Sequence, residues 1–343
     1  MNSPVLPKAF FDWLVSLGLC KANAPIKAWP LEGGVSSDIW KFELEGKTYC
    51  VKRALSRLKV KAHWEAPLSR NTHEANWLRF VYQLDGRYAP QCLANDPERG
   101  MLLMPFLPDA CYQLWKSMLF DARCTPESAR AVGYRLAHIH AASASNKDIL
   151  GDFDHPELFS ALRLEPYLIA TAAKHSDLSD YFMAVCERTA GSTQCLIHGD
   201  ISPKNIMIGS DGPLFLDAEC ACLGDPAFDI AFCLNHLLLK RFAAPRHLDL
   251  YRSSFITLIE GYQQALDAWG GWEDWNGLEW RIASLLPALA LARIDGKSPV
   301  EYFQLESQKA QVRALSRQTM LQQVSCLHTI NQAWSPDEVF HDH

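Results

Sequence analysis

Residues 198–219 limit what this chain can fold into more than any other stretch. They read HGDISPKNIMIGSDGPLFLDAE. Asp200 and Asn205 lie on a short loop that contains a proline, and Asp217 follows an apolar, strand-like run. Phosphoryl transfer needs a carboxylate that orients the attacking hydroxyl and accepts its proton, and it needs oxygen ligands that hold Mg²⁺ against nucleotide phosphates. The pattern favours this chemistry, with Asp200 in the first role and Asn205 and Asp217 in the second.

The same segment resembles the aminoglycoside phosphotransferase and choline kinase-like group of small-molecule kinases. Protein kinases carry His-Arg-Asp and later Asp-Phe-Gly at these places. Here Gly199 replaces the arginine, and Asp217-Ala218-Glu219 replaces the second motif. Residues 224–231, GDPAFDIA, match the next segment of the group. His-Gly-Asp alone is weak evidence, but the features together are specific. The chain also resembles kinases of the methylthioribose type.

The resemblance implies an α+β, bilobal protein-kinase-like fold, with a small antiparallel-sheet N-lobe and a large, mainly helical C-lobe. We expect an N-terminal nucleotide-binding lobe over residues 1–103, a hinge at 104–107, and a C-terminal catalytic and substrate-binding lobe over 108–343. The chain contains no repeat and no Gly/Ser-rich linker. The two lobes are therefore expected to belong to one folding unit.

A nucleotide-covering loop is expected at residues 32–38, between predicted strands at 28–31 and 39–44. Glycine lets backbone N–H groups approach phosphates closely, because it has no side chain to block them. A Gly-Gly turn by itself is more often an ordinary hairpin, so the resemblance carries this interpretation. It implies nucleotide contacts from the loop and from the hinge, where an apolar wall would face adenine: Gly33, Gly34, Ser36, Ser37, Met104 and Phe106.

Lys52 ends a third predicted strand, where the kinase pattern Val-Ala-Ile-Lys has its phosphate-binding lysine. The resemblance implies a glutamate partner on the following helix. Residues 71–81 are amphipathic, and Glu74 lies near their start. Glu65 is the alternative partner, but Pro67 argues against a helix through it. We therefore expect Glu74 to hold Lys52 against the phosphates.

Several residues of the predicted C-lobe have supporting or open roles. The resemblance assigns His198 to loop support, and Asp229 is expected as a buried anchor of the loop at the start of a helix. Glu219 is either a second Mg²⁺ contact or a residue that orients the metal carboxylate. Arg293 and Asp295 follow an apolar helix. Comparable positions face the acceptor in kinases of the methylthioribose type, so they are candidate substrate residues.

Other features keep two interpretations each. The basic connection at 53–64 either clamps an anion or is a solvated loop. Lys204 either stabilises charge in the transition state or is solvated. The tryptophan-rich, acidic stretch 269–280 suits a cationic acceptor, although packing is the commoner use. Two pairs that invite a metal reading are interpreted as packing residues: Cys220 with Cys222, and His138 with His140.

Composition narrows the functional class. The 343 residues are 48% hydrophobic, carry a formal net charge of −6 and contain no dense Lys/Arg block, which argues against a nucleic-acid partner. No secretion signal or membrane span is evident, and eleven scattered cysteines favour reduced thiols. We therefore expect a cytoplasmic protein with no membrane partner.

The sequence thus predicts an ATP- and Mg²⁺-dependent kinase, or less readily a GTP-dependent one. It would move the γ-phosphoryl group to a hydroxyl of a small molecule: an amino-alcohol, an aminoglycoside, a sugar or a hydroxylated amino acid. A nucleotide-binding regulatory protein without turnover is the alternative. A protein kinase is disfavoured, because no Asp-Phe-Gly to Ala-Pro-Glu segment is present. The acceptor and the oligomeric state are left open.

Overall fold

The computed structural model describes residues 5–31, 37–55, 67–146, 150–153 and 155–336. The chain forms two compact units, Met1–Cys111 and Tyr112–His343, each of which is described by itself. Several predicted positions lie outside the described residues: Gly33, Gly34 and Ser36, the alternative partner Glu65, and most of the basic connection.

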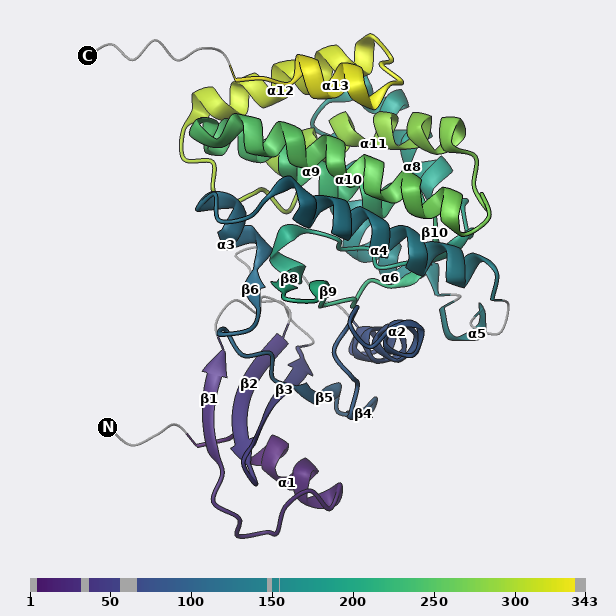
Figure 1. Cartoon of the computed structure of the whole chain (residues 1–343). Coiled ribbons are helices and arrows are strands. Elements are labelled where there is room, and N and C mark those ends of the chain that lie inside the picture. Colours follow the sequence, from purple (N-terminus) through teal and green to yellow (C-terminus); the bar gives the residue numbers. More distant parts are fainter. Residues whose placement is uncertain (1–4, 32–36, 56–66, 147–149, 154, 337–343) are drawn as a thin grey trace, which may run out of the picture. The chain divides into compact units, whose positions relative to one another are not determined.

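The first unit contains an antiparallel sheet of five strands in the order β1-β2-β3-β5-β4 (Figure 1). Its elements confirm the strands and the helix expected from the sequence. Their bounds are α1 (Lys8–Ser16), β1 (Lys27–Leu31), β2 (Ser37–Leu44), β3 (Lys47–Ala54), α2 (Arg70–Leu84), β4 (Ala94–Asp96) and β5 (Met101–Pro105).

The core of this unit lies between α1 and the sheet. Phe10 and Leu14 of α1 are fully buried in one cluster with Phe42 and Val51 of the sheet. Strands β2 and β3 are joined by Glu45 and Gly46, both with positive φ, the geometry that matches the right-handed twist of a two-residue hairpin. Strand β3 is central, since it pairs with β2 on one side and β5 on the other. The sheet therefore holds the backbone of Lys52 on both sides.

The second unit is mainly helical. Its bounds are β6 (Gln113–Leu114), α3 (Trp115–Phe120), α4 (Pro126–Ala144), α5 (Leu150–Phe153), α6 (Pro156–Phe159), the π-helical segment η2 (Ser160–Ile169), α7 (Ala170–Ala172), η3 (Ser176–Leu178), α8 (Ser179–Ala190), β7 (Cys195–Ile197), η4 (Pro203–Asn205), β8 (Ile206–Gly209), β9 (Gly212–Phe215), β10 (Cys222–Gly224), α9 (Pro226–Ala243), η5 (Pro245–His247), α10 (Leu248–Ala268), α11 (Trp275–Asp295), α12 (Glu306–Leu321) and α13 (Leu327–Ala333).

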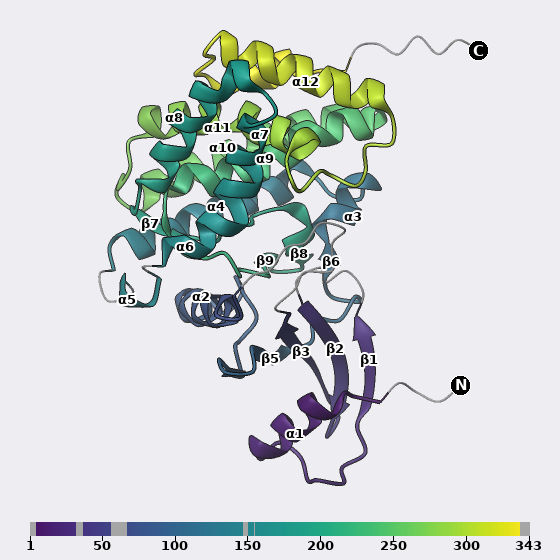
Figure 2. The same ribbon diagram turned by 180° about the vertical axis from the view of Figure 1, so that it is seen from behind.

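Helix α9 is the central element of this unit. Every residue from Pro226 to Phe242 is buried, and the buried residues include the polar side chains Asp229, Asn235, His236, Lys240 and Arg241. Helix α11 packs along it, and α10 packs along both α9 and α4. Figure 1 shows α12 and α13, in yellow, on the outer side of this layer, and Figure 2 shows α7 and α8 from behind. The start of α9, which carries Asp229, is thus buried among other elements of the unit.

Helices α4 and α10 approach each other unusually closely. A Cβ added at Gly133 would lie 2.0 Å from the backbone oxygen of Leu258, and one added at Gly261 would lie 2.0 Å from that of Arg130. Only glycine leaves room for this backbone contact. Helix α4 of this pair also packs against strands β7 and β9.

Two short sheets carry the segment singled out by the sequence. Strand β7 pairs with β10, and β8 pairs with β6 and β9. The chain leaves β7 at Ile197, passes through η4 and returns along β8 and β9. Asp200 and Asn205 thus precede the β8–β9 hairpin, and Asp217 follows it. The hairpin brings residues that are apart in sequence to one end of the same small sheet.

The division between the units falls after Cys111. The sequence analysis put a hinge at residues 104–107, of which Met104 and Pro105 belong to strand β5. The hinge role of these residues stays a prediction. Among the described residues, none of the helices is both long enough and apolar enough to cross a membrane.

Candidate active site

Asp229 holds the loop that contains Asp200. It lies in the first turn of α9, and its two carboxylate oxygens accept hydrogen bonds from the backbone N–H groups of His198, at 2.7 Å, and Gly199, at 2.8 Å. The side chain is fully buried. Hydrogen bonds from backbone amides to a carboxylate are charge-assisted and strong. The predicted anchoring role of Asp229 is confirmed.

Gly199 is required by the shape of this loop. Its φ is +75°, in the left-handed region, and a Cβ at this position would lie 2.7 Å from the carbonyl oxygen of Cys220. A side chain would therefore be both strained and in collision with backbone. This explains why the loop cannot carry the arginine that protein kinases have at this place.

His198 connects the loop to the strand that leads to Asp217. Its Nδ1 accepts from the N–H of Asp200 at 3.1 Å, and its Nε2 lies 2.9 Å from the carbonyl oxygen of Leu216. These partners assign the proton to Nε2. Burial lowers the pKa of His198 below its usual value, so the ring is neutral. It acts as a fixed brace, in agreement with the supporting role expected for it.

Asp200 is a buried carboxylate with two cationic neighbours. Its Oδ2 lies 3.0 Å from Nη2 of Arg163 and 3.2 Å from Nζ of Lys204. Burial acts to raise the pKa of Asp200, but Lys204 and Arg163 outweigh it, and the pKa lies below its usual value. The group is therefore ionised at neutral pH. Both contacts use the same oxygen, and the structure records no partner for Oδ1 among the described residues.

Arg163 was not predicted from the sequence. It lies on η2, and besides its contact with Asp200 its Nε donates to the carbonyl oxygen of Gly199 at 2.6 Å. The segment around it carries no motif. The one signal in the sequence is an arginine within an apolar stretch, ALRLEPYLI, because a charged side chain is buried only with a partner. Lys204, whose role was left open, lies beside Asp200 with its side chain half exposed.

Asn205 and Asp217 flank the β8–β9 hairpin next to this loop. Asn205 donates from Nδ2 to the carbonyl oxygen of Asp200 at 3.0 Å, and its own carbonyl oxygen accepts from the N–H of Leu216 at 2.9 Å. Its Oδ1 is thus the atom left for a ligand. Asp217 has a φ of +65°, a strained conformation for a residue with a side chain, and such strain is common at functional sites.

The donor set of this loop fits Mg²⁺. The amide oxygen of Asn205 and the carboxylates of Asp217 and Glu219 are hard oxygen ligands, and Mg²⁺ usually binds to one or two such groups, substrate phosphates and water. Within residues 5–336, apart from the gaps given above, no three His, Cys, Asp or Glu side chains form a metal cage. The arrangement therefore suits a cation that arrives with phosphate ligands.

In the first unit, Lys52 and Glu74 form a buried ion pair. Nζ of Lys52 lies 2.7 Å from Oε2 of Glu74, and both side chains are almost completely buried. The pairing expected from the sequence is therefore present, while the contact of Lys52 with phosphates stays a prediction. Ser37 is buried at the start of β2. The ring of Phe106 lies 4.5 Å from Nζ of Lys41, and neither it nor Met104 has a tested role.

A model of the phosphotransferase enzyme family matches residues 27–280. The chain belongs to this family. The matched region contains all of the loop and strand residues described above, and it confirms the resemblance drawn from the His-Gly-Asp loop and the GDPAFDIA segment.

Solved structures of kinases share the fold of this phosphotransferase. An amicoumacin kinase in complex with AMP-PNP, Ca²⁺ and Ami superposes with a TM-score of 0.60 at 12% identity, covering 93% of this chain and 96% of that one. The ethanolamine kinase of Plasmodium vivax gives a TM-score of 0.57 at 15% identity, covering 90% and 87%. These similarities confirm the α+β, protein-kinase-like fold.

A methylthioribose kinase from Escherichia coli O45:K1 is 27% identical to this chain over 239 residues. The match covers 60% of this chain and 56% of the length of that relative. The similarity thus extends over part of each protein.

The two candidate substrate residues of the family member lie at the end of α11. Arg293 is buried, and its Nη1 donates to the hydroxyl of Tyr167 at 3.1 Å. Asp295 accepts from Nε of Arg313 at 2.8 Å and lies 3.0 Å from Nε2 of His175. These contacts tie Asp295 to α12, whereas Arg293 lies among aromatic side chains near η2. Contact of either residue with an acceptor stays a prediction.

The residue pairs interpreted as packing have packing contacts. The ring of His138 stacks on Trp269 with centroids 3.8 Å apart, and His140 lies 3.0 Å from the hydroxyl of Tyr262. Cys220 and Cys222 are buried, and burial raises the pKa of both thiols. In the tryptophan-rich stretch, Glu273 pairs with Arg281 and Asp274 caps α11. Its carboxylates are therefore engaged within the second unit.

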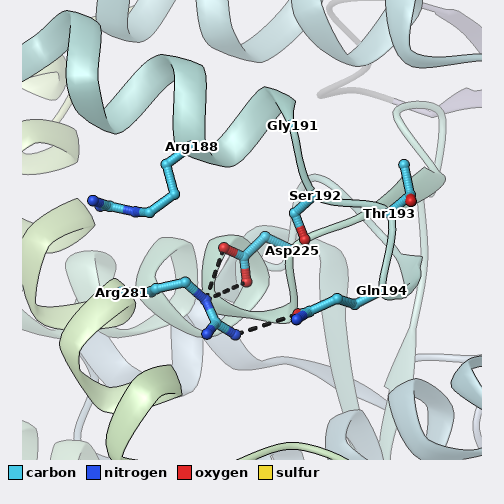
Figure 3. A pocket seen from close by; sticks show the side chains of 7 residues that line it. All are labelled: Arg188, Gly191, Ser192, Thr193, Gln194, Asp225 and Arg281. Atoms are coloured by element: carbon cyan, nitrogen blue, oxygen red, sulfur yellow. Dashed lines mark hydrogen bonds and ion pairs between the residues drawn. The ribbon is translucent and has the colours of Figure 1, made fainter.

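Figure 3 shows a pocket of about 350 Å³ elsewhere in the second unit. Arg281 lies across its floor, bonded to Asp225 and Gln194, and Arg188 extends along its side. The lining residues are Arg188, Gly191, Ser192, Thr193, Gln194, Asp225 and Arg281. None of them is a candidate catalytic or metal-binding residue. The arginine in the floor has its charge balanced by Asp225 and Glu273.

Proposed function

We propose that this phosphotransferase transfers the γ-phosphoryl group of ATP, in the presence of Mg²⁺, to a hydroxyl group of a small molecule. The proposal rests on the burial, the charge and the contacts of the Asp200 carboxylate. This carboxylate is buried, ionised and fixed by Arg163 and Lys204 through Oδ2 alone. Oδ1 is the atom that would accept the proton of an attacking hydroxyl.

Other residues of the loop would position Asp200 and bind the metal ion. His198 and Asp229 hold the backbone on which Asp200 stands, so that its carboxylate keeps its direction without reorganisation. Asn205 Oδ1 and the carboxylate of Asp217 would hold Mg²⁺, with Glu219 as a further ligand or as a residue that orients Asp217. When bound, Mg²⁺ neutralises charge on the phosphate oxygens.

Cationic side chains would then stabilise the phosphates. In the first unit, Lys52 is held by Glu74 in one position, which suits contact with the α- and β-phosphates. In the second unit, Lys204 lies beside Asp200 with a half-exposed side chain, so it can approach the transferred group. The nucleotide loop with Ser37 and the residues Met104 and Phe106 would contribute the remaining nucleotide contacts.

An ADP-release assay tests this proposal. The assay uses ATP and Mg²⁺ with a panel of amino-alcohols, aminoglycosides, sugars, thio-sugars and hydroxylated acids. Asp200→Asn should retain ATP binding and lose turnover by about 10²-fold or more, the scale of a lost general base. The control is Asp211→Asn, an exposed carboxylate in the adjacent hairpin turn, which should keep full activity.

The alternatives give different results. Full activity in Asp200→Asn would show that the catalytic role assigned to this loop is wrong. ATP binding without turnover across the panel would favour a nucleotide-binding regulatory protein, and labelling of generic protein substrates would favour a protein kinase.

A further inference from the structure

Lys240 is a buried lysine near the end of α9 whose charge is not matched by a carboxylate contact. The residue is 1% exposed. Its Nζ lies between two aromatic rings, 4.7 Å from the centroid of Phe120 and 4.9 Å from that of Tyr302. In the described part of the chain, these ring contacts are the interactions recorded for its amine. A buried cation without an ion-pair partner is costly, and contact with two ring faces offsets only part of that cost, so the amine suits an anionic ligand.

Polar groups without partners gather around this lysine. The hydroxyl of Tyr302 and Nε of Arg293 are buried and have no hydrogen-bond partner in the structure as described. His236 lies one helical turn before Lys240 on α9, and its pKa is held well below the usual value by burial and by the charges of Arg293 and Lys240. Lys116 is also close, but it forms an ion pair with Glu301. The cluster therefore has more positive than negative charge, and it contains hydrogen-bond donors that have no acceptor.

The cluster lies next to the candidate catalytic carboxylate. The ring of Tyr167 is shared by two guanidinium groups, that of Arg163 at 5.8 Å and that of Arg293 at 5.6 Å. The ring of Phe232 is likewise contacted by Arg163 at 5.7 Å and by His236 at 5.5 Å. Arg163 itself contacts Asp200. The rings of Tyr167 and Phe232 thus border both the cluster and Arg163, the arginine that contacts Asp200.

We infer that Lys240, Arg293, His236 and Tyr302 bind an anionic group of the acceptor, a carboxylate or a phosphate, and that the acceptor is therefore a hydroxylated acid. An ammonium, a guanidinium and a phenol hydroxyl are the donors that bind such oxyanions. A polycationic aminoglycoside or a quaternary amine would meet like charge here, which costs affinity. The inference rests on the proposed function, since it names the substrate class of the same site.

Anion binding at this cluster is coupled to a proton. Burial, assisted by Lys116 and Arg293 and opposed by Glu301 and Cys233, lowers the pKa of Lys240 to about 7. An anion beside the amine favours its charged form. The cluster therefore takes up a proton when the anion binds, and the affinity for the anion falls as the pH rises above 7.

The test compares possible acceptors that have similar shapes but carry different charges. Glycerate, glycerol and 3-aminopropane-1,2-diol present similar hydroxyl groups with a negative, neutral or positive end. Ribose 5-phosphate and ribose form a second matched set, in which the negative group is a phosphate instead of a carboxylate. Binding to the full chain is measured by calorimetry, with and without a non-hydrolysable ATP analogue and Mg²⁺. Turnover is measured separately as ADP release.

The variants are Lys240→Met, which removes the amine, and Lys240→Arg, which keeps the charge. Lys297→Met is the control, because Lys297 is a half-exposed lysine paired with Glu165. Glycerate or ribose 5-phosphate should bind more tightly than its neutral and cationic counterparts. Lys240→Met should weaken that binding by about tenfold or more, the scale of a lost charged hydrogen bond. Lys240→Arg should restore part of it, and the affinity for ATP should not change.

The outcomes distinguish the two proposals. Equal or tighter binding of the cationic member, no binding of either anion, or unchanged anion binding in Lys240→Met overturns the inference. The proposed function survives such a result if neutral or cationic acceptors are phosphorylated in an Asp200-dependent way. Conversely, Lys240-dependent anion binding without ADP release from any acceptor supports the anion site and removes the proposed function. Preference for glycerate over ribose 5-phosphate, or the reverse, identifies the anion.

Discussion

Arg163 and Asp200 form a buried ion pair, 3.0 Å from Nη2 to Oδ2, in which both side chains are at least nine-tenths buried. Arg163 also donates to the carbonyl oxygen of Gly199. One guanidinium thus holds both the backbone of the His-Gly-Asp loop and the carboxylate that ends it. Arg163 is a positioning residue, since it acts on the reaction through Asp200.

Replacement of Arg163 should therefore affect both stability and rate. Arg163→Gln leaves Asp200 with Lys204 as its remaining cation, and a broken buried pair costs about 3–5 kcal/mol. Turnover should fall by about 10²-fold, with a larger effect on kcat than on the KM for ATP. The pKa of Asp200 should rise, so the acidic limb of the pH–rate profile should move to higher pH. Arg163→Lys should restore part of the rate.

The control for this change is Arg123→Gln, which removes an exposed arginine paired with Asp121 and should cost less than about 1 kcal/mol. A pH–rate profile of Arg163→Gln with an unshifted acidic limb would contradict the effect of Arg163 on Asp200. Urea unfolding measures the loss of stability, and ADP release measures the loss of turnover and the pH–rate profile.

Gly199→Ala should destabilise the loop more than its positive φ alone explains. Gly46 offers a matched comparison, because it also has a φ of +75° but has open space around its Cβ position. Gly46→Ala should cost about 1–2 kcal/mol from backbone strain. Gly199→Ala adds a collision with the backbone of Cys220 and should cost about 2 kcal/mol more. Thermal unfolding of the two variants measures the difference, and equal losses would show that the collision is relieved by movement of Cys220.

Loss of the Lys52–Glu74 pair should weaken ATP binding. Glu74→Gln removes the carboxylate that holds Lys52, and the lysine should then lose the direction that suits the phosphates. The KM for ATP should rise about tenfold, with a smaller effect on the KM for the acceptor. Lys8 and Asp12 form an exposed ion pair on α1 of the same unit. Asp12→Asn should leave the KM for ATP unchanged, and an equal rise in both variants would count against a specific role for Glu74.

The stability of the protein should depend on Lys240 in a defined pH window. The pKa of its amine is about 7 in the folded protein against an ordinary value of 10.5. Between these values the unfolded chain binds more protons, so the free energy of unfolding rises with pH. Below about pH 7 the contribution is constant and unfavourable.

A comparison of the wild type with Lys240→Met isolates this contribution. Chemical unfolding of each protein is measured between about pH 7 and 8.5, and ionisation of thiols in the unfolded chain, which begins in this range, cancels because both proteins carry the same cysteines. The free energy of unfolding of the wild type relative to the variant should rise by about 1.6 kcal/mol over this range. A flat difference would mean that Lys240 keeps a normal pKa. Lys297→Met should show no such slope.

Much of the site could be predicted because its residues are close in sequence or follow a regular element. Lys52 stands on a strand and Glu74 near the start of the next helix, so the pairing that the resemblance implies could be assigned to particular residues from the order of the elements. Asp229 was recognised as an anchor because it opens a helix just after the loop. These contacts depend on local geometry, which the residue pattern specifies.

Arg163 and Lys240 could not be found in this way. Arg163 lies in a segment without a motif, and it reaches Asp200 only because η2 packs next to the loop. Lys240 reads as an ordinary charged residue near a helix end, where lysine is common. Its burial follows from the packing of α3 and of the segment after α11 around α9. The contacts of Asp295 with Arg313 likewise depend on how α12 packs on α11.

The sequence by itself, through motifs that resemble a known family, determined the fold class and the family, and it predicts the chemistry of the loop, because glycine, proline and carboxylate positions specify backbone shape and ligand type over short distances. The tertiary structure alone decided which charges are buried together. Burial depends on contacts between segments far apart in the chain, and it is burial that makes Asp200 depend on Arg163 and that leaves Lys240 without an ion-pair partner.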